Sequence, residues 1–432
     1  MKGRPGFRLI ILILLLLAGL APGGVWAGEF SLARFNDRLA DAGIDYRGFL
    51  DLRGGWRVRE PVDERHTSLG EARLQLDIDY DLGWVVGKFK GDLFADAVER
   101  SSGGTIREAY LLGSPLDFAD LKVGRQVLTW GTGDLLFIND LFPKDWKSFF
   151  TGRENEYLKA PAEAARLSLF FDVVNIDLVY MPRFNPSEYI NGQRLSYWSP
   201  LFGNTVGRDH ELRDHGRNSW FSEDEVAVRL FRNFSGLEAA FYFYDGYWKT
   251  PEGMKADGRV YFPRLRSFGF SLRRDLFGGL ANLEAGWYDS RDDRDGDDPM
   301  VRNSEWRFLV GFEHELGDDF TGSLQYYLEV IQDYDDYRDS LPPGMEKRDE
   351  YRHLLTLRLT RLLLRQNLIL SLFAYYSPSD NDAYLRPQIS YKLTDNWLIF
   401  AGGNLFYGAE DYTFFGQFES NSNLYGGLRY NF

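Results

Sequence analysis

Apolar and polar positions alternate along most of this 432-residue chain, in short runs separated by turn-forming residues. The segment 71–81 shows the pattern most clearly, because its even positions from Ala72 to Tyr80 are apolar and its odd positions from Arg73 to Asp79 are polar. Successive side chains of a β-strand point to opposite faces. The alternation therefore predicts strands with one apolar and one polar face.

The same reading along the whole chain predicts eighteen strands. They lie near 43–58, 71–81, 84–98, 105–113, 119–129, 163–172, 175–183, 223–232, 236–247, 263–273, 279–290, 304–314, 319–333, 350–363, 367–377, 383–393, 396–408 and 422–432. Eighteen satisfies the even-number rule of bacterial single-chain barrels, and ambiguous segments near 105–129 and 175–183 leave sixteen as an alternative.

The connections between these strands alternate in length. Tight turns such as Asp81–Gly83 and Asn233–Gly236 are followed mostly by long connections, and the last strand ends on the aromatic Phe432. Short periplasmic turns and long extracellular loops are typical of outer-membrane barrels. We therefore predict an all-β fold, a transmembrane antiparallel up-and-down β-barrel. A soluble sandwich or propeller shares the composition but would need a second sheet or a repeat to cover the apolar face.

The N-terminal segment has the pattern of a secretory signal peptide. Lys2, Arg4 and Arg8 precede an apolar run over 9–20, and small residues follow it before Gly28. A membrane anchor is the alternative, but the run is shorter than the roughly 20 residues that a span requires. We expect a signal peptide at 1–27, a periplasmic segment at 28–42 that is either a short amphipathic helix or disordered, and the barrel at 43–432.

Composition excludes several classes of protein. The net charge is −14, aromatic residues make up 16% and there is no Cys, so thiol chemistry and disulfides are excluded. No apolar run beyond the N-terminus is long enough for a membrane helix, and the acidic balance disfavours nucleic-acid binding. Five His residues without Cys give no convincing metal or haem spacing, and no phosphate-binding or nucleophile-elbow motif is present. We expect no cofactor.

One segment carries a family resemblance. The stretch Val123–Gly131, with the sequence VGRQVLTWG, precedes a long loop that ends in Tyr157–Pro161, with the sequence YLKAP. It resembles the central segment of large porin-like barrels of the alginate-export type and of related outer-membrane families. The resemblance covers under a tenth of the chain and implies an 18-stranded pore lined by basic residues. It does not imply alginate as the substrate, because no sugar-binding residue can be matched.

The polar face of each strand predicts the residues that line the lumen. The candidate pore-lining bases are Arg73, Lys88, Lys90, Lys122, Arg166, Arg229, Arg307, Arg352, Arg358 and Arg386. Such an excess of guanidinium and ammonium groups predicts a net basic lumen that favours carboxylate or phosphate solutes. Arg352, Arg358 and Arg386 are the best candidates for a basic ladder, because few acids lie nearby in sequence. The alternative is that these bases pair with acids on neighbouring strands and only solvate the wall.

The loop from Gly131 to Pro161 is unusually apolar for a surface segment. It mixes nine large apolar side chains with charged ones, and its charged candidates are Asp134, Asp140, Lys144, Lys147 and Arg153. So much apolar area is costly on an open surface. We predict that the loop folds into the lumen as a constriction; a lid over the outer rim or a contact between protomers is the alternative.

Two further loops carry weaker signals. The segment 183–221 contains Asp209–His210 and Asp214–His215, which could orient a base for hydrolysis. The acidic run 291–298 resembles part of a calcium loop, but Arg291 and Arg302 stand where acidic ligands are required. We expect a solvated loop there, and no enzymatic activity.

The sequence thus favours a passive channel in the outer membrane for diffusion or export of small polar, anionic solutes. The expected partners are the outer-membrane lipids and lipopolysaccharide, with a homo-oligomer possible. The alternative is a structural barrel that encloses a periplasmic partner, such as an electron carrier or a secretion component.

Overall fold

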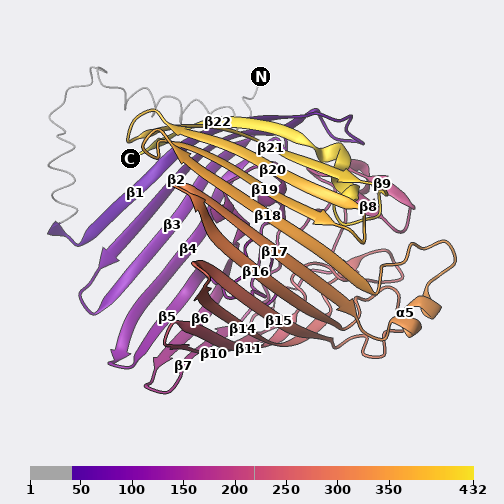
Figure 1. Ribbon diagram of the computed structural model, residues 1–432, viewed down its shortest axis with the longest axis horizontal. Coiled ribbons are helices and arrows are strands. Elements are labelled where there is room, and N and C mark those ends of the chain that lie inside the picture. Colours follow the sequence, from indigo (N-terminus) through magenta and orange to yellow (C-terminus); the bar gives the residue numbers. More distant parts are fainter. Residues whose placement is uncertain (1–40, 218) are drawn as a thin grey trace.

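A closed barrel accounts for most of the chain. The structure, a computed structural model, describes residues 41–217 and 219–432, so the predicted signal peptide lies outside the described residues. Within them, eighteen strands form one antiparallel sheet. The sheet closes because β1 (Ile44–Arg57) pairs with β22 (Asn423–Asn431), from Phe49 opposite Asn431 to Arg57 opposite Asn423. Figure 1 shows the strands tilted together around the barrel. Closure removes the sheet edges that would leave backbone groups unpaired.

The remaining barrel strands follow one another in chain order around the sheet. They are β2 (Thr67–Asp81), β3 (Val85–Asp96), β4 (Ser101–Leu116), β5 (Ala119–Val127), β6 (Pro161–Phe170), β7 (Asn175–Met181), β10 (Glu225–Phe234), β11 (Leu237–Tyr247), β14 (Arg264–Leu276), β15 (Gly279–Ser290), β16 (Glu305–Gly317), β17 (Phe320–Ile331), β18 (Tyr351–Leu363), β19 (Leu368–Ser377), β20 (Asp382–Lys392) and β21 (Trp397–Gly408).

The predicted all-β up-and-down barrel of eighteen strands is confirmed, and the ends of the strands differ from the prediction by a few residues. The largest differences are in β2 and β4, which begin four residues earlier than predicted. In β4 the pairing with β3 shifts at Lys90 and Gly91, which pair with Glu108 and Ile106. Arg107 is therefore an extra, bulged residue, and a bulge interrupts the alternation by which a strand is recognised in a sequence.

The tight turns gather at one end of the barrel, where Figure 1 also places the C-terminus. In the turn after β2, the Asp81 side chain accepts the N–H of Gly83 at 2.7 Å, and Gly83 has a φ of +84°. In the turn between β10 and β11, the Asn233 side chain accepts the N–H of Gly236 at 2.9 Å. These glycines adopt a left-handed backbone that tight hairpins require.

The longer connections carry the other elements. They are α3 (Trp146–Thr151), α4 (Asn155–Leu158), α5 (Tyr334–Ser340), the 3-10 helices η1 (Arg208–His210) and η2 (Gly416–Asn421), and the strand pairs β8 (Tyr197–Ser199) with β9 (Asn204–Val206) and β12 (Gly253–Met254) with β13 (Val260–Tyr261). Figure 1 shows α5, β8 and β9 at the end opposite the tight turns. In the described part of the chain, no helix has the length and apolar character needed to cross a bilayer.

The outer face of the barrel is apolar and uncovered. Phe241, Val310 and Leu324 leave more than half of their surface exposed, whereas charged neighbours on the opposite face, such as Asp177 and Glu284, are buried. This inverts the usual arrangement of a water-soluble protein. It is the arrangement of a barrel whose outer wall contacts acyl chains and whose polar side chains face the interior.

Candidate pore constriction and vestibule

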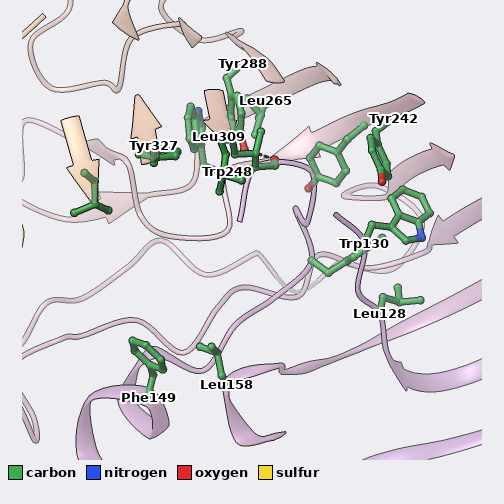
Figure 2. Packing of buried hydrophobic residues seen from close by; sticks show 14 of the residues in the cluster. Leu128, Trp130, Phe149, Leu158, Tyr242, Trp248, Leu265, Tyr288, Leu309 and Tyr327 are labelled. Atoms are coloured by element: carbon green, nitrogen blue, oxygen red, sulfur yellow. Dashed lines mark hydrogen bonds between the residues drawn. The ribbon is translucent and has the colours of Figure 1, made fainter. Parts of the chain in front are cut away.

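The connection between β5 and β6 runs into the barrel instead of over its rim. We call residues 128–160 the lumen loop. Its apolar side chains form one buried cluster with inward-facing residues of many strands. Figure 2 shows Trp130 of the loop beside Tyr242 of β11, with their ring centres 5.9 Å apart. The ring of the loop residue Phe149 likewise lies 5.9 Å from the ring of Tyr384 on β20. The predicted position of this loop inside the lumen agrees with these contacts.

On one wall, a buried carboxylate binds the start of the loop. Glu284 of β15 is buried and accepts hydrogen bonds from the N–H of Thr132, the N–H of Gly133 at 2.7 Å and the N–H of Asn139 at 3.3 Å. The Asn139 side chain donates a fourth at 2.9 Å. Hydrogen bonds to an ionised acceptor are stronger than those between neutral groups. Glu284 therefore fixes the first turn of the lumen loop against the wall.

The opposite wall holds the end of the loop. Tyr157 is buried between the guanidinium carbons of Arg73 and Arg107, which lie 4.7 and 4.4 Å from the centre of its ring. Its hydroxyl accepts a hydrogen bond from Gln75 at 2.9 Å. The Arg107 guanidinium also donates to the carbonyls of Glu156 and Lys159, both at 3.0 Å. The loop is thus attached to both sides of the lumen.

Tyr157→Phe is expected to reduce the free energy of unfolding by about 1 kcal/mol, because it removes one buried hydrogen bond and leaves Gln75 with only its bond to Asp92. Urea titration of the protein in detergent micelles measures this change. Tyr180→Phe is the matched control, since that residue lies exposed on the outer face of β7. Equal losses in the two variants would contradict the proposed anchor.

The predicted pore-lining bases all lie on the face of the strands that carries the loop contacts, and most have an acidic partner. The closest contacts are Arg73 with Asp92 at 2.6 Å, Lys88 with Asp77, Lys90 with Glu156, Arg166 with Asp177 at 3.0 Å, Arg229 with Asp177 at 3.9 Å, Arg307 with Glu305, Arg352 with Asp380 at 2.7 Å and Arg358 with Asp134 at 2.6 Å. Lys122 instead lies 3.7 Å from the centre of the Tyr110 ring. The inner wall therefore carries a network of ion pairs.

These ion pairs differ from the expected basic ladder. Few acids lie near Arg352 and Arg358 in sequence, but Asp380 and Asp134 reach them from connecting segments, so both bases are paired. Arg386 differs. Its Nη1 donates to Asn155 at 3.2 Å, its guanidinium lies 4.1 Å from the centre of the Phe149 ring, and it has no carboxylate in any ion pair of the described residues.

The charged residues of the loop mostly hold its own shape or tie it to the wall. Lys144 binds Asp140 at 2.9 Å, and Asp140 also accepts from Thr129 at 2.9 Å. Burial lowers the pKa of the Lys144 ammonium, and the Asp140 carboxylate opposes part of that effect. Arg153 pairs with Glu71 of β2, and Lys147 lies 3.6 Å from Glu188.

Between the lumen loop and the long connections lies a cavity of about 760 Å³, which we call the vestibule. One side of it contains a charged cluster, in which Arg302 contacts Glu252 at 3.3 Å and Glu329 at 3.0 Å. Burial opposes ionisation of Glu252, but Arg302 holds the pKa of that carboxyl below its usual value. Figure 2 shows Trp248 and Tyr288 grouped here, with their rings stacked at 5.5 Å.

The structure places residues of the weaker sequence signals in separate polar contacts. Asp214 accepts a hydrogen bond from the Tyr189 hydroxyl at 2.8 Å, while Nε2 of His215 lies 3.6 Å from Asp257. Asp214 and His215 thus contact different partners. The Asp293 carboxylate accepts a hydrogen bond from the N–H of Gly296 at 3.1 Å. No group of three or more metal-ligating side chains is found among the described residues.

Sequence reasoning missed several residues of the wall. Glu71 and Asp177 are buried acids that pair with Arg73 and Arg166, and both lie at positions where alternation puts a side chain inward. The alternation could have found them. No signal pointed to Arg302, which lies in a connection just before β16 and contacts three carboxylates.

Comparisons with known proteins agree with the geometry. No protein-family model matches this chain, and no curated protein matches it. Among solved structures, OccK5 (OpdH) from Pseudomonas aeruginosa matches with a TM-score of 0.54 and 11% identity, over 90% of this chain and 97% of that one. OmpF from Salmonella typhi, solved with daunomycin, matches with a TM-score of 0.44 and 10% identity, over 91% and 99% of the two chains. The likeness to OccK5 shows a shared porin-like barrel fold.

Proposed function

We propose that this protein is a passive channel of the outer membrane for small polar solutes, with a preference for anions. The observation that carries the proposal is the division of most barrel strands into an exposed apolar side and a polar or charged inner side. Charged groups of both signs along an inner wall need water, and a closed barrel of eighteen strands is wide enough to hold it. The lumen loop would set the size limit.

A base beside the lumen loop supports the preference for anions. Arg386 lies on β20 against the loop residues Phe149 and Asn155, and no ion pair of the described residues neutralises it. A guanidinium group in a narrow pore between low-dielectric walls attracts anions more strongly than in open water. The paired bases nearby contribute less, because each carboxylate partner cancels most of the field at a distance.

Arg386→Gln is expected to reduce the ratio of chloride to potassium permeability. The measurement is the reversal potential of the purified protein in a planar bilayer under a KCl gradient. Arg274→Gln is the control, because Arg274 pairs in register with Leu237 and Ala281 on the outer face. A wild-type channel that already prefers potassium would refute the anion preference, while the channel itself would stand.

The second candidate is a structural barrel that encloses a periplasmic partner. It is favoured by the attachment of the lumen loop to both walls, since a loop held in this way occupies part of the lumen. Bilayers that show no current despite correctly folded protein would favour this candidate. Detectable single-channel current would exclude it.

A further inference from the structure

The vestibule is far more aromatic than a wall for small ions requires. Of the 42 residues that line it, 15 are Phe, Tyr or Trp, whereas these residues make up 16% of the whole chain. Its volume of about 760 Å³ lies within the roughly 300–1,000 Å³ of small-molecule sites. Inorganic ions need neither the size nor the apolar lining.

Two aromatic residues of the lumen loop form a part of the vestibule surface that we call its aromatic floor. Phe137 and Trp146 are partly exposed, and their ring centres are 6.0 Å apart in an edge-to-face arrangement. Trp146 also stacks on Phe150 at 6.2 Å. Apolar surface that faces water costs about 25 cal/mol per Å², so a floor of this kind is stabilised when an apolar ring covers it.

Arg352, which lines the vestibule, has N–H groups without a hydrogen-bond partner among the described residues. Nε of Arg352 donates a hydrogen bond to Asp380 at 2.7 Å, and the guanidinium carbon lies 5.0 Å from the centre of the Phe414 ring. Its Nη2 is buried without a hydrogen-bond partner, and no hydrogen bond of the described residues uses its Nη1. Arg302, in contrast, already contacts three carboxylates. The two nitrogens of a guanidinium fork match a carboxylate.

We propose that the vestibule is a binding site for aromatic carboxylates, with the ring on Phe137 and Trp146 and the carboxylate on Arg352. The proposal rests on the proposed channel function, whose solute class it specifies. Binding at this site would concentrate the solute above the constriction. Because the ring and the carboxylate contact different residues, the two halves of the proposal can be tested separately.

The first test is binding, which does not depend on conduction. Isothermal titration calorimetry of the full-length protein in detergent is expected to detect 3-phenylpropionate, and to give a much weaker signal with hexanoate or with 3-phenylpropanol. Trp146→Ala with Phe137→Ala is expected to weaken binding of 3-phenylpropionate about tenfold or more, because the ring loses its stacking partners. Trp146→Phe retains an aromatic floor and is expected to restore most of the affinity.

Arg352→Gln is expected to weaken the binding of 3-phenylpropionate without changing the small affinity for 3-phenylpropanol. Trp397→Phe is the control for a general effect of losing a tryptophan, since Trp397 packs on Tyr430 near the C-terminus. Equal binding of the alcohol and the carboxylate, or of hexanoate and 3-phenylpropionate, would overturn the proposal. So would unchanged affinity in the double variant.

The second test separates this site from the channel function. In planar bilayers, 3-phenylpropionate is expected to interrupt the ionic current briefly in the wild type and less often in the double variant. Current without such interruptions and without calorimetric binding would overturn the vestibule site and leave the channel intact. Binding without any current would do the reverse, because it would support the site and refute the channel.

Discussion

Replacing residues 129–159 by a short glycine–serine linker is expected to raise the single-channel conductance severalfold. The reason is that the lumen loop packs inside the barrel and contacts both walls, whereas an empty barrel of eighteen strands encloses a wide aqueous pore. The linker can join the strands directly, because Val127 of β5 and Pro161 of β6 are paired neighbours in the sheet. Conductance in planar bilayers at fixed salt measures the effect.

The deletion needs a check on folding, because it removes a large part of the buried apolar cluster. Circular dichroism and resistance to protease in detergent report whether the strands still form a barrel. Replacing α5 (Tyr334–Ser340) by a linker is the matched control, since Figure 1 shows this helix outside the barrel. A folded deletion variant with unchanged conductance would show that the lumen loop does not form the constriction.

Glu284→Ala is expected to release the start of the lumen loop from the wall. The change leaves the backbone N–H groups of Thr132, Gly133 and Asn139 without their acceptor. An orphaned buried donor costs about 1–3 kcal/mol, so the loop gains more by opening toward water than by keeping its native position. We expect a noisier open channel with a larger mean conductance and a lower thermal stability.

Glu284→Gln retains one acceptor oxygen but no charge, so its conductance and noise should lie between those of the wild type and of Glu284→Ala. Glu313→Gln on the neighbouring strand β16 is the control for a lost lumen charge, because Glu313 is exposed and no hydrogen bond of the described residues joins it to the lumen loop. Identical recordings from all three variants would remove Glu284 from its proposed role.

The lumen wall shows why some of the site could be predicted and some could not. Register in an antiparallel sheet follows from alternation, so Arg166 and Asp177 could be assigned to the inner face from sequence before their contact was known. The partner of Arg358 could not, since Asp134 is 224 positions away along the chain. The same holds for Arg153 and Glu71, which are 82 positions apart. An ion pair between segments so distant depends on the path of the loop through the barrel.

The sequence by itself determined the barrel, because a period of two positions in apolar residues and a succession of tight turns constrain each strand locally. It also indicated that the loop after Gly131 lies inside, since that segment is too apolar for an open surface. Only the tertiary structure decided which lumen charges are neutralised and where the aromatic vestibule lies. Both depend on side chains brought together across the lumen by closure of the sheet, and a local pattern in sequence carries no information about that distance.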